Sequence, residues 1–270
     1  MTNPEQLRDA WNRFAAGYDE AVTAFSMQIA EDALGRIDIA PGMRFLDVAA
    51  GGGALSIPAA RLGAEVLATD FSPVMVDRLR TRAREEGLSN LEVRVMDGQA
   101  LELEDNTFNV SGSQLGIMMF PDRERGLEEL HRVTKPGGQA VMVVFGPVQR
   151  VEGFAYFFRA VQSGIPGFTP PSDSSLFSLQ DPEQLRKEMA AAGFRDIRVD
   201  TVNHGLEVES AAHLWDMLTS ATPPIGALAA NLTEEQTAVA RAALDGILQE
   251  HTVGNPAILN MQFHIGIGTS

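Results

Sequence analysis

Three short apolar segments of the chain end in or near an aspartate, and these carboxylates are the side chains best suited to hold a polar ligand. The segments RFLDVA, AEVLATD and LEVRVMD carry Asp47, Asp70 and Asp97. Ligands of open parallel sheets bind beyond the carboxyl ends of the strands, so we expect the three acids to border one site. Asp70 offers two oxygens to the hydroxyls of a ribose. Asp97 would accept from an exocyclic amine while an adjoining backbone N–H, at Gly98 or Gln99, donates to a ring nitrogen. Taken singly, each acid is also typical of a helix N-cap or a turn.

A glycine-rich loop, AAGGG, follows the first of these segments. Glycine lets a ligand approach the backbone closely, and the next helix would direct free N–H groups at a carboxylate or phosphate. The spacing Gly51-x-Gly53-x-x-Ser56 approximates a dinucleotide-binding motif, with Asp70 about 20 residues on where a ribose-binding acid belongs. A turn that serves only packing is a second alternative. Against a dinucleotide, Ser56 replaces the third glycine, and Asp47 would repel a pyrophosphate and attract an amine.

The composition limits the kind of protein and the kind of partner. Of the 270 residues, 44% are hydrophobic, enough for the packed core of one large domain or two small ones. The 36 acidic residues outnumber the 21 basic ones, and a net charge of −15 repels phosphate backbones and anionic lipid headgroups. The densest basic run, from Arg78 to Arg84, is followed by Glu85 and Glu86 and is typical of a solvated helix face. We therefore expect neither nucleic acid nor a membrane as a partner.

The sequence has no cysteine, and we expect no targeting segment. Without cysteine the chain forms no disulfide, thiolate nucleophile or Cys-ligated metal site, and neither an HExxH motif nor a tight cluster of acids and histidines suggests another metal site. The start MTNPEQLRDAWNRF lacks a signal-peptide pattern, and no apolar run approaches the roughly 18 residues of a membrane span. We expect a cytoplasmic protein without a bound metal.

Apolar runs alternate with helical periods between residues 44 and 146, and this alternation predicts an α/β fold. Helices are expected near 54–62, 73–86 and 123–133, each after a strand-like run, which implies right-handed crossovers and a parallel sheet covered on both faces. Before this region, residues 4 to 36 have a helical period that we expect Gly17 to break and Gly35 to end.

The remaining segments are expected to complete the same domain. Residues 147–180, rich in aromatic, proline and serine residues, look inserted. After them we expect the helix PEQLRKEMAAAG, the strand FRDIRVDTV, and helices at about 210–219 and 233–250 that flank a loop or short broken helix, TPPIGALAANL. The final apolar segment, ILNMQFHIGIGT, fits a buried strand. With no long linker, we expect one domain over residues 1–270. Its core would comprise about 36–146, 181–208 and 258–270, and its cap about 1–35, 147–180 and 210–257.

Four motifs in order give the chain a resemblance to a known family. FLDVAAGGG, LATDFSPVMVDRLR, VMDGQALELEDNTF and LEELHRVTKPGGQAVM are similar to the motifs of class I S-adenosylmethionine-dependent methyltransferases, within them the ubiquinone/menaquinone-biosynthesis group. The resemblance covers residues 11 to 146 and, more weakly, 181 to 208. It implies a Rossmann-like, seven-stranded, mostly parallel sheet in the order 3-2-1-4-5-7-6, with the last strand antiparallel, and a helical cap. Ala49 and Asn109 stand where the family usually has glycine and aspartate.

The resemblance also implies the cofactor, S-adenosylmethionine, and the residues around it. Gly51, Gly53 and Ser113 would border its methionine moiety, Asp70 its ribose, and Tyr18 would close over it. The full set that the resemblance and the strand-end acids assign to the cofactor is Tyr18, Asp47, Ala49, Gly51, Gly53, Asp70, Phe71, Ser72, Met75, Asp97, Gly98, Gln99 and Ser113.

The chemistry that follows makes few demands on acid–base catalysis. Displacement at a sulfonium releases a neutral thioether, so catalysis rests on holding the nucleophile in line, and a base is needed only where the acceptor must lose a proton. Among the histidines, His204 is the candidate base, with a structural role in the cap as its alternative. Further aromatic and methionine side chains indicate either an apolar acceptor pocket or ordinary packing. They are Phe154, Tyr156, Phe157, Phe158, Phe168, Phe177, Met118, Met119 and Phe120.

The sequence therefore predicts a methyltransferase that uses S-adenosylmethionine and acts on a small, apolar or aromatic molecule at an oxygen or carbon nucleophile. A homodimer is left open. One alternative is a protein that binds the cofactor without methylating, as a cyclase or as a partner of another protein. The other is a nucleotide-dependent oxidoreductase, which the incomplete glycine motif and the acids Asp47 and Asp97 disfavour.

Overall fold

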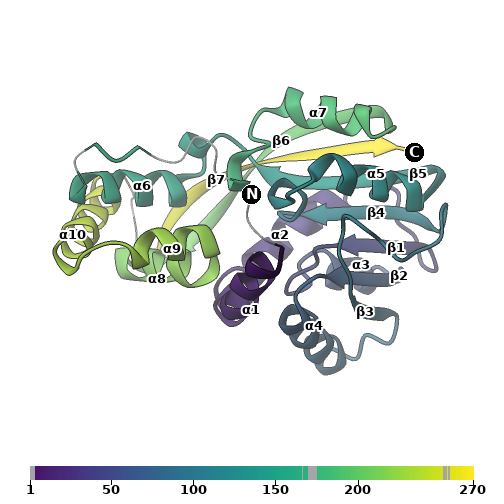
Figure 1. Cartoon of the computed structure of the whole chain (residues 1–270), viewed down its shortest axis with the longest axis horizontal. Helices are drawn as coiled ribbons and strands as arrows, with labels where there is room; N and C mark the ends of the chain where they lie inside the picture. Colours follow the sequence, from purple (N-terminus) through teal and green to yellow (C-terminus); the bar gives the residue numbers. More distant parts are fainter. Residues whose placement is uncertain (1–3, 166, 170–174, 252–253, 255) are drawn as a thin grey trace.

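A seven-stranded sheet with helices on both faces forms one half of the molecule, and a group of helices forms the other (Figure 1). The computed structural model describes residues 4–165, 167–169, 175–251, 254 and 256–270. Residues 166 and 170–174 of the predicted insertion, and residues 1–3, 252–253 and 255 of the predicted cap, lie outside the described residues.

The strands are arranged in the order β3-β2-β1-β4-β5-β7-β6, which confirms the order that the resemblance implies. Strands β1 to β5 pair in parallel, and β7 runs antiparallel to both of its neighbours, β5 and β6. The bounds are β1 (Arg44–Val48), β2 (Glu65–Asp70), β3 (Leu91–Val95), β4 (Phe108–Gln114), β5 (Thr134–Phe145), β6 (Arg195–Val208) and β7 (Ala257–Thr269).

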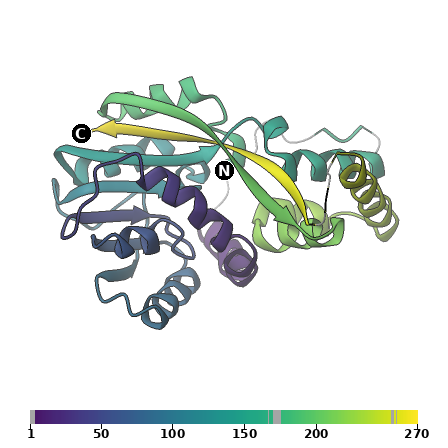
Figure 2. The same ribbon diagram turned by 180° about the vertical axis from the view of Figure 1, so that it is seen from behind.

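Helices cover both faces of the sheet. On one face lie α3 (Ser56–Arg61) and α4 (Pro73–Glu85), which contact the strands from β1 to β3, and on the other lie α5 (Arg123–Val133) and α7 (Pro182–Ala191) (Figures 1 and 2). The N-cap side chains of α4, α5 and α7, Ser72, Asp122 and Asp181, each accept a backbone N–H from the first turn. These caps explain why the helices start where the sequence predicts.

The N-terminal helices correct one prediction. Helix α1 (Pro4–Ala21) continues through Gly17, and the break before α2 (Thr23–Leu34) falls at Val22. A Cβ atom at Gly17 would lie 2.4 Å from the Ser220 carbonyl oxygen, so this glycine allows α1 to approach helix α8 rather than ending a helix. The predicted end near Gly35 is confirmed.

The second half of the molecule gathers around the long strands β6 and β7. These strands run for 14 and 13 residues, against five in β1, and they extend beyond the rest of the sheet. Around the extension lie α6 (Glu152–Gly164), α8 (Ala211–Ala221), α9 (Pro223–Ala230) and α10 (Glu234–His251) (Figures 1 and 2). The predicted loop or broken helix is α9. Three-residue 3-10 helices occur at Ile117–Met119, Val148–Arg150 and Ser175–Phe177. Helix α1 contacts both α4 and α8 and so lies between the two halves.

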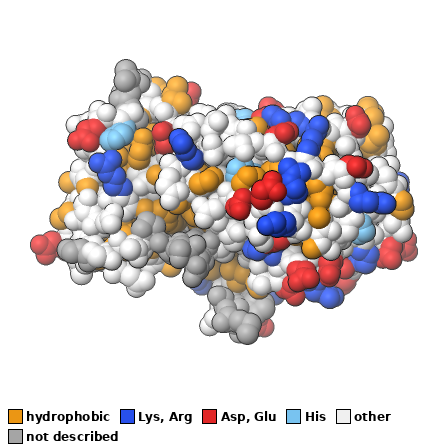
Figure 3. Space-filling view, turned by 90° about the horizontal axis from the view of Figure 1, so that it is seen from above, with side chains coloured by type: hydrophobic (Ala, Val, Ile, Leu, Met, Phe, Trp, Pro, Cys, Tyr) orange, Lys and Arg blue, Asp and Glu red, His pale blue; other side chains and the backbone are white. Residues whose placement is uncertain are grey.

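The surface of the two halves also differs. On the face seen in Figure 3, acidic and basic side chains are interspersed over the half that contains the sheet and are sparser over the half built from α6 and α10.

None of the described helices combines the length and the apolar character needed to cross a membrane.

Candidate functional site

Two adjoining cavities lie where the strands β1 to β4 end and α1 passes over them. The first cavity is lined by residues of the strand ends and of α1, and the second by residues of α1, α2 and the extended part of the molecule. They enclose about 810 and 640 Å³ of open space, the solvent at their mouths included, which is the size range of small-molecule sites. Trp11, Tyr18, Leu115 and Met119 line both, so the two cavities share a boundary.

The glycine loop forms one wall of the first cavity. After β1 the backbone enters the left-handed region at Ala49, with φ +59°, and again at Gly51, with φ +53°. A Cβ atom at Gly51 would lie 3.4 Å from the Tyr18 ring, so its absence keeps the space beneath Tyr18 open. Gly53 does not line the cavity. A Cβ atom there would meet Leu79 at 2.2 Å, so this glycine serves the packing of the loop on α4.

Asp70 is held at the end of β2 by two backbone donors. Its Oδ1 accepts from Ser72 N and its Oδ2 from Gly51 N, both at 2.9 Å. Burial raises the pKa of this carboxyl to about 6, and the two backbone bonds oppose the rise. Each carboxylate oxygen has a further lone pair. Because Asp70 lines the first cavity, these lone pairs can accept two hydroxyl groups of one ligand.

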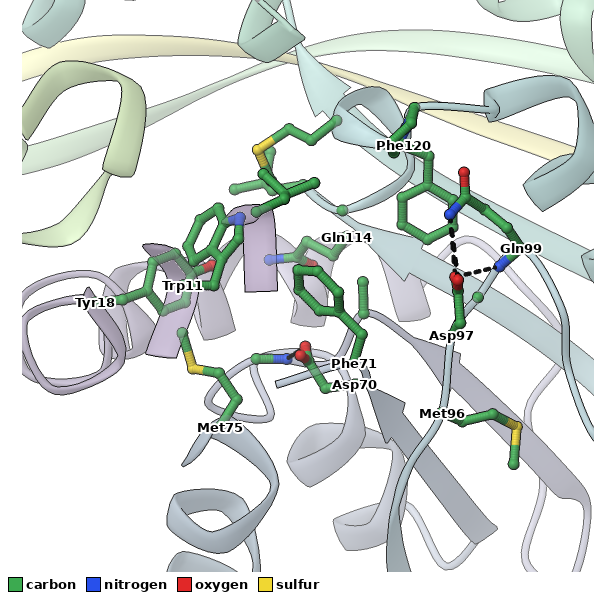
Figure 4. A pocket seen from close by; sticks show the side chains of 18 residues that line it. Trp11, Tyr18, Asp70, Phe71, Met75, Met96, Asp97, Gln99, Gln114 and Phe120 are labelled. Carbon is green, nitrogen blue, oxygen red and sulfur yellow. Dashed lines mark hydrogen bonds between the residues drawn. The ribbon is translucent and has the colours of Figure 1, made fainter. Parts of the chain in front are cut away.

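Asp97, Gly98 and Gln99 form a turn on the opposite wall (Figure 4). Asp97 Oδ1 accepts from Gln99 N at 2.9 Å and from Gln99 Nε2 at 3.1 Å. Gln99 Oε1 in turn accepts from Asp122 N at 2.7 Å, which ties the turn to the start of α5. Apolar side chains border the slot between this wall and Asp70, with Phe71 beside Asp70 and Phe120 beside Gln99 (Figure 4). A flat heterocycle with an amine at its edge fits such a slot.

Nine of the thirteen residues assigned from the sequence line the first cavity, namely Tyr18, Ala49, Gly51, Asp70, Phe71, Met75, Asp97, Gly98 and Gln99. The other four lie just behind it. Ser72 caps α4, accepting from Met75 N at 3.1 Å and donating to Asn12 Oδ1 at 2.7 Å, and Gly53 packs on α4. Ser113 Oγ accepts from Ile117 N at 3.1 Å.

Asp47 is the fourth of these residues and is buried below the loop. One of its oxygens accepts the Ser56 hydroxyl, and the other has no hydrogen-bond partner. Burial, and secondly the charge of Asp70, raise the pKa of Asp47 to about 7 against the effect of the Ser56 bond. Asp47 therefore acts beneath the cavity, through the loop it supports.

Helix α1 covers the first cavity with Trp11 and Tyr18, which meet edge to face with ring centroids 5.8 Å apart (Figure 4). Burial raises the pKa of Tyr18 to about 12. The helix is fixed by Asp19, whose carboxylate pairs with Arg82 and, at 2.9 Å, with Arg78 Nε. Two members of the basic run are thus engaged in this contact, which corrects the expectation of a wholly solvated face.

Several lining residues were not predicted. They are Leu7, Trp11, Met96, Gln114, Leu115, Gly116 and Pro121, together with Met119 and Phe120, which were assigned to an acceptor pocket. Two signals could have found some of them. Gln114 ends β4 at the same edge as the three acids, and Trp11 lies two helical turns before Tyr18, on the same face of α1.

The second cavity is almost wholly apolar. Phe25, Phe145, Phe154, Met217 and Met261 are among its lining residues, and few polar side chains reach it. Of the predicted acceptor pocket, Phe154, Met118 and Met119 line this cavity. Phe120 lines the first cavity, and the remaining aromatic residues of that prediction lie in or against the hydrophobic core.

None of the five histidines, all of which the structure describes, lines either cavity. His204 lies on β6, where its Nε2 is 3.1 Å from Asp32 Oδ2. This geometry gives His204 a structural contact with α2 and no access to the cavities. Nor do three or more His, Asp or Glu side chains of the described ranges gather where a metal ion could bind.

Comparison with known proteins identifies the family. Residues 46–142 match the family model described as a methyltransferase domain. Demethylmenaquinone methyltransferase of Thermus thermophilus is 34% identical over 187 residues, which are 64% of this chain and 82% of that protein. An uncharacterized protein of Mycobacterium tuberculosis is 44% identical over 100 residues, and this alignment spans 37% of the chain and only 36% of that relative. The crystal structure of the [4+2]-cyclase SpnF covers 90% of this chain and 81% of its own, with a TM-score of 0.56 at 21% identity, and shows the same fold.

The chain belongs to the class I S-adenosylmethionine-dependent methyltransferases and resembles their menaquinone group. The cofactor of this family is S-adenosylmethionine, and the first cavity fits it. Paired acceptors at Asp70 suit the ribose, the slot beside Asp97 suits an adenine, and the open space at Gly51 admits the rest of the molecule.

Proposed function

We propose that this protein transfers a methyl group from S-adenosylmethionine to a small, largely apolar or aromatic molecule, at an oxygen or carbon nucleophile and by direct displacement. The observation that carries the proposal is the common boundary of the two cavities, at Trp11, Tyr18, Leu115 and Met119. A cofactor held in the first cavity and an acceptor held in the second would meet there.

The cofactor supplies an electrophilic methyl group, and the chain supplies position and exclusion of water. Asp70 and Asp97 line the first cavity on two sides, where they can accept hydrogen bonds from the cofactor, and Trp11 and Tyr18 cover the cavity. The apolar second cavity orients its ligand by shape. Holding two reactants in line supplies much of the rate enhancement of such a displacement.

The described residues at the boundary include no evident base. The histidines lie elsewhere, and Tyr18, with a pKa of about 12, stays protonated at neutral pH. The arrangement therefore suits an acceptor that is already nucleophilic, such as an electron-rich ring carbon or an acidic hydroxyl group, over one that must first lose a tightly held proton.

The test is calorimetric titration of the purified protein with S-adenosylmethionine, S-adenosylhomocysteine and NADH. We expect binding of the sulfur-containing pair and not of NADH. Asp70→Ala should weaken S-adenosylhomocysteine binding by about 100-fold, because it removes two charge-assisted hydrogen bonds. Asp77→Ala, which removes an exposed carboxylate on α4, is the matched control and should bind as the wild type does.

Binding of NADH alone, or an unchanged affinity in Asp70→Ala, would contradict the proposal. A screen of hydroxylated aromatic compounds for formation of S-adenosylhomocysteine then tests the transfer itself. Cofactor binding without turnover across that screen would favour the non-methylating alternative.

A further inference from the structure

Two buried side chains, one lining each cavity, have oxygens that accept no hydrogen bond. Ser26 on α2 lines the second cavity, and Gln114 at the end of β4 lines the first. Their exposed fractions are 1% and 7%. Within the described part of the chain, the buried side-chain oxygens that accept no hydrogen bond are Ser26 Oγ, Gln114 Oε1 and Asp47 Oδ1. Two of these three thus belong to residues that line the proposed ligand sites.

The side chain of Gln114 has a fixed orientation. Its Nε2 donates to the Ser26 carbonyl oxygen at 2.7 Å. Because that carbonyl can only accept, the amide nitrogen must face α2, and Oε1 is left as a free acceptor. Figure 4 shows Gln114 reaching from β4 into the space between Trp11 and Phe71. The same bond joins the two residues, so Ser26 and Gln114 form one unit.

The surroundings make an unpaired oxygen here costly. The second cavity is lined mainly by apolar side chains such as Phe25, Met217 and Met261. A buried acceptor without a donor loses its hydrogen bonds to water and gains none from the protein, which is unfavourable. Tyr18 is the polar neighbour of Ser26, whose hydroxyl opposes the rise that burial causes in the pKa of Tyr18. A ligand that offers a hydrogen to Gln114 Oε1 therefore restores a bond that the protein alone does not make.

We propose that Ser26 and Gln114 anchor the hydroxyl group of the acceptor molecule at the boundary of the two cavities; this rests on the methyl-transfer function proposed above. Gln114 Oε1 accepts the O–H of the acceptor, and the Ser26 hydroxyl turns from Tyr18 to donate a second hydrogen bond to the same oxygen. Since Gln114 Oε1 only accepts, an ether, a ketone or a carboxylate cannot pair with it. The pair thus selects a neutral group with a hydrogen to donate and holds it beside the first cavity.

The experiment compares 1-naphthol with 1-methoxynaphthalene, which has nearly the same shape and no hydrogen to donate. Both are titrated calorimetrically into the full-length protein saturated with S-adenosylhomocysteine. We expect the wild type to bind 1-naphthol about tenfold more tightly than the ether, the effect of one or two neutral hydrogen bonds. Ser26→Ala and Gln114→Leu should each reduce that ratio to about twofold, and the double variant should abolish it.

The controls separate this proposal from the function on which it rests. Ser111→Ala removes a buried serine whose hydroxyl is already paired with Thr134, and it should keep the tenfold ratio. The affinity for S-adenosylhomocysteine should stay within about twofold of the wild type in Ser26→Ala and Ser111→Ala, because neither residue lines the first cavity. A wild type that fails to bind S-adenosylhomocysteine would overturn the proposed function.

With S-adenosylhomocysteine bound, three results would overturn the anchor alone. These are equal binding of the two naphthalenes by the wild type, binding of neither, and a ratio that survives both substitutions. A loss of S-adenosylhomocysteine affinity in Gln114→Leu would assign Gln114 to the cofactor and equally reject the pair.

Discussion

The first and second cavities are built from different parts of the chain and recognise their ligands by different physics. Strand ends and loops of the sheet line the first, where backbone N–H groups and the carboxylates of Asp70 and Asp97 set fixed directions. Helices α1, α2 and α8 and the extended ends of β6 and β7 line the second with apolar side chains. The first can therefore hold one defined molecule, whereas the second selects by shape and by the few polar atoms at its boundary.

The buried acids of the first cavity give that half of the molecule a stability that depends on pH. Burial raises the pKa of Asp47 from 3.8 to about 7 and that of Asp70 from 3.8 to about 6. The folded state thus binds more protons than the unfolded state, so the free energy of unfolding should fall as pH rises from about 4 to about 7. Asp47→Asn should remove the part of this fall that Asp47 causes, on the order of 4 kcal/mol at pH 8, and flatten the profile.

Urea unfolding of the wild type and Asp47→Asn at several pH values measures this effect. Asp77→Asn, at an exposed position, serves as the control and should follow the wild type. Parallel profiles for Asp47→Asn and the wild type would show that Asp47 is not a source of the dependence.

Filling the second cavity should separate the two ligands. Met217 lines only the second cavity, so Met217→Trp is expected to reduce 1-naphthol binding by about tenfold or more while S-adenosylhomocysteine affinity changes by less than about twofold. Calorimetry with each ligand tests this, and Val239→Trp on the exposed face of α10 is the matched control. A parallel loss of both affinities would mean that the cavities do not bind independently.

Helix α1 belongs to both cavities, and its attachment at Asp19 should affect the cofactor. Asp19 is mostly buried and pairs with Arg78 and Arg82, and Arg82 also donates to the Gly52 carbonyl at 3.0 Å. Asp19→Asn should loosen the cover formed by Trp11 and Tyr18 and weaken S-adenosylhomocysteine binding by roughly five-fold. Glu20→Gln, at an exposed neighbour 3.7 Å from Arg78, should have no such effect. Equal affinities in Asp19→Asn and Glu20→Gln would refute the role of this contact.

The smallest predicted effect concerns the backbone of the glycine loop. Ala49 has φ +59°, a left-handed conformation that costs a residue with a Cβ atom about 1 kcal/mol relative to glycine. Ala49→Gly should therefore raise the free energy of unfolding by up to about 1 kcal/mol. Ala50→Gly, in the same loop without a left-handed backbone, should lower it. A lower stability for Ala49→Gly in urea unfolding would contradict this account.

Residues of the first cavity could be predicted from the sequence because the end of a strand is a local feature. Each acid follows an apolar run, and parallel strands bring their carboxyl ends to one edge of the sheet. The sequence alone therefore predicts that Asp70 and Asp97 border one site. The sheet order and the antiparallel strand likewise followed from the motif resemblance, and they are confirmed. Ser72, which the sequence assigns to the cofactor, caps α4 behind the cavity wall.

The second cavity could not be read in the same way because it depends on contacts between distant segments. An apolar residue such as Met217 has the same local pattern whether it lines a cavity or fills the core. Gln114 has no charge, and β4 does not end in an acid. Only the position of Gln114 at the end of a parallel strand indicates that it lines the site. A glycine within a helical period predicts a break at Gly17, because the approach of α8 cannot be inferred from the sequence.

A crystal structure of the protein with S-adenosylhomocysteine and 1-naphthol bound together tests the central claim most directly. The two-cavity account predicts the ribose of the cofactor product against Asp70, the naphthol ring beside Phe25 and Phe154, and its hydroxyl within hydrogen-bonding distance of Gln114 Oε1. Naphthol in the first cavity, or S-adenosylhomocysteine extending through both, would contradict the division of the molecule into a cofactor site and an acceptor site.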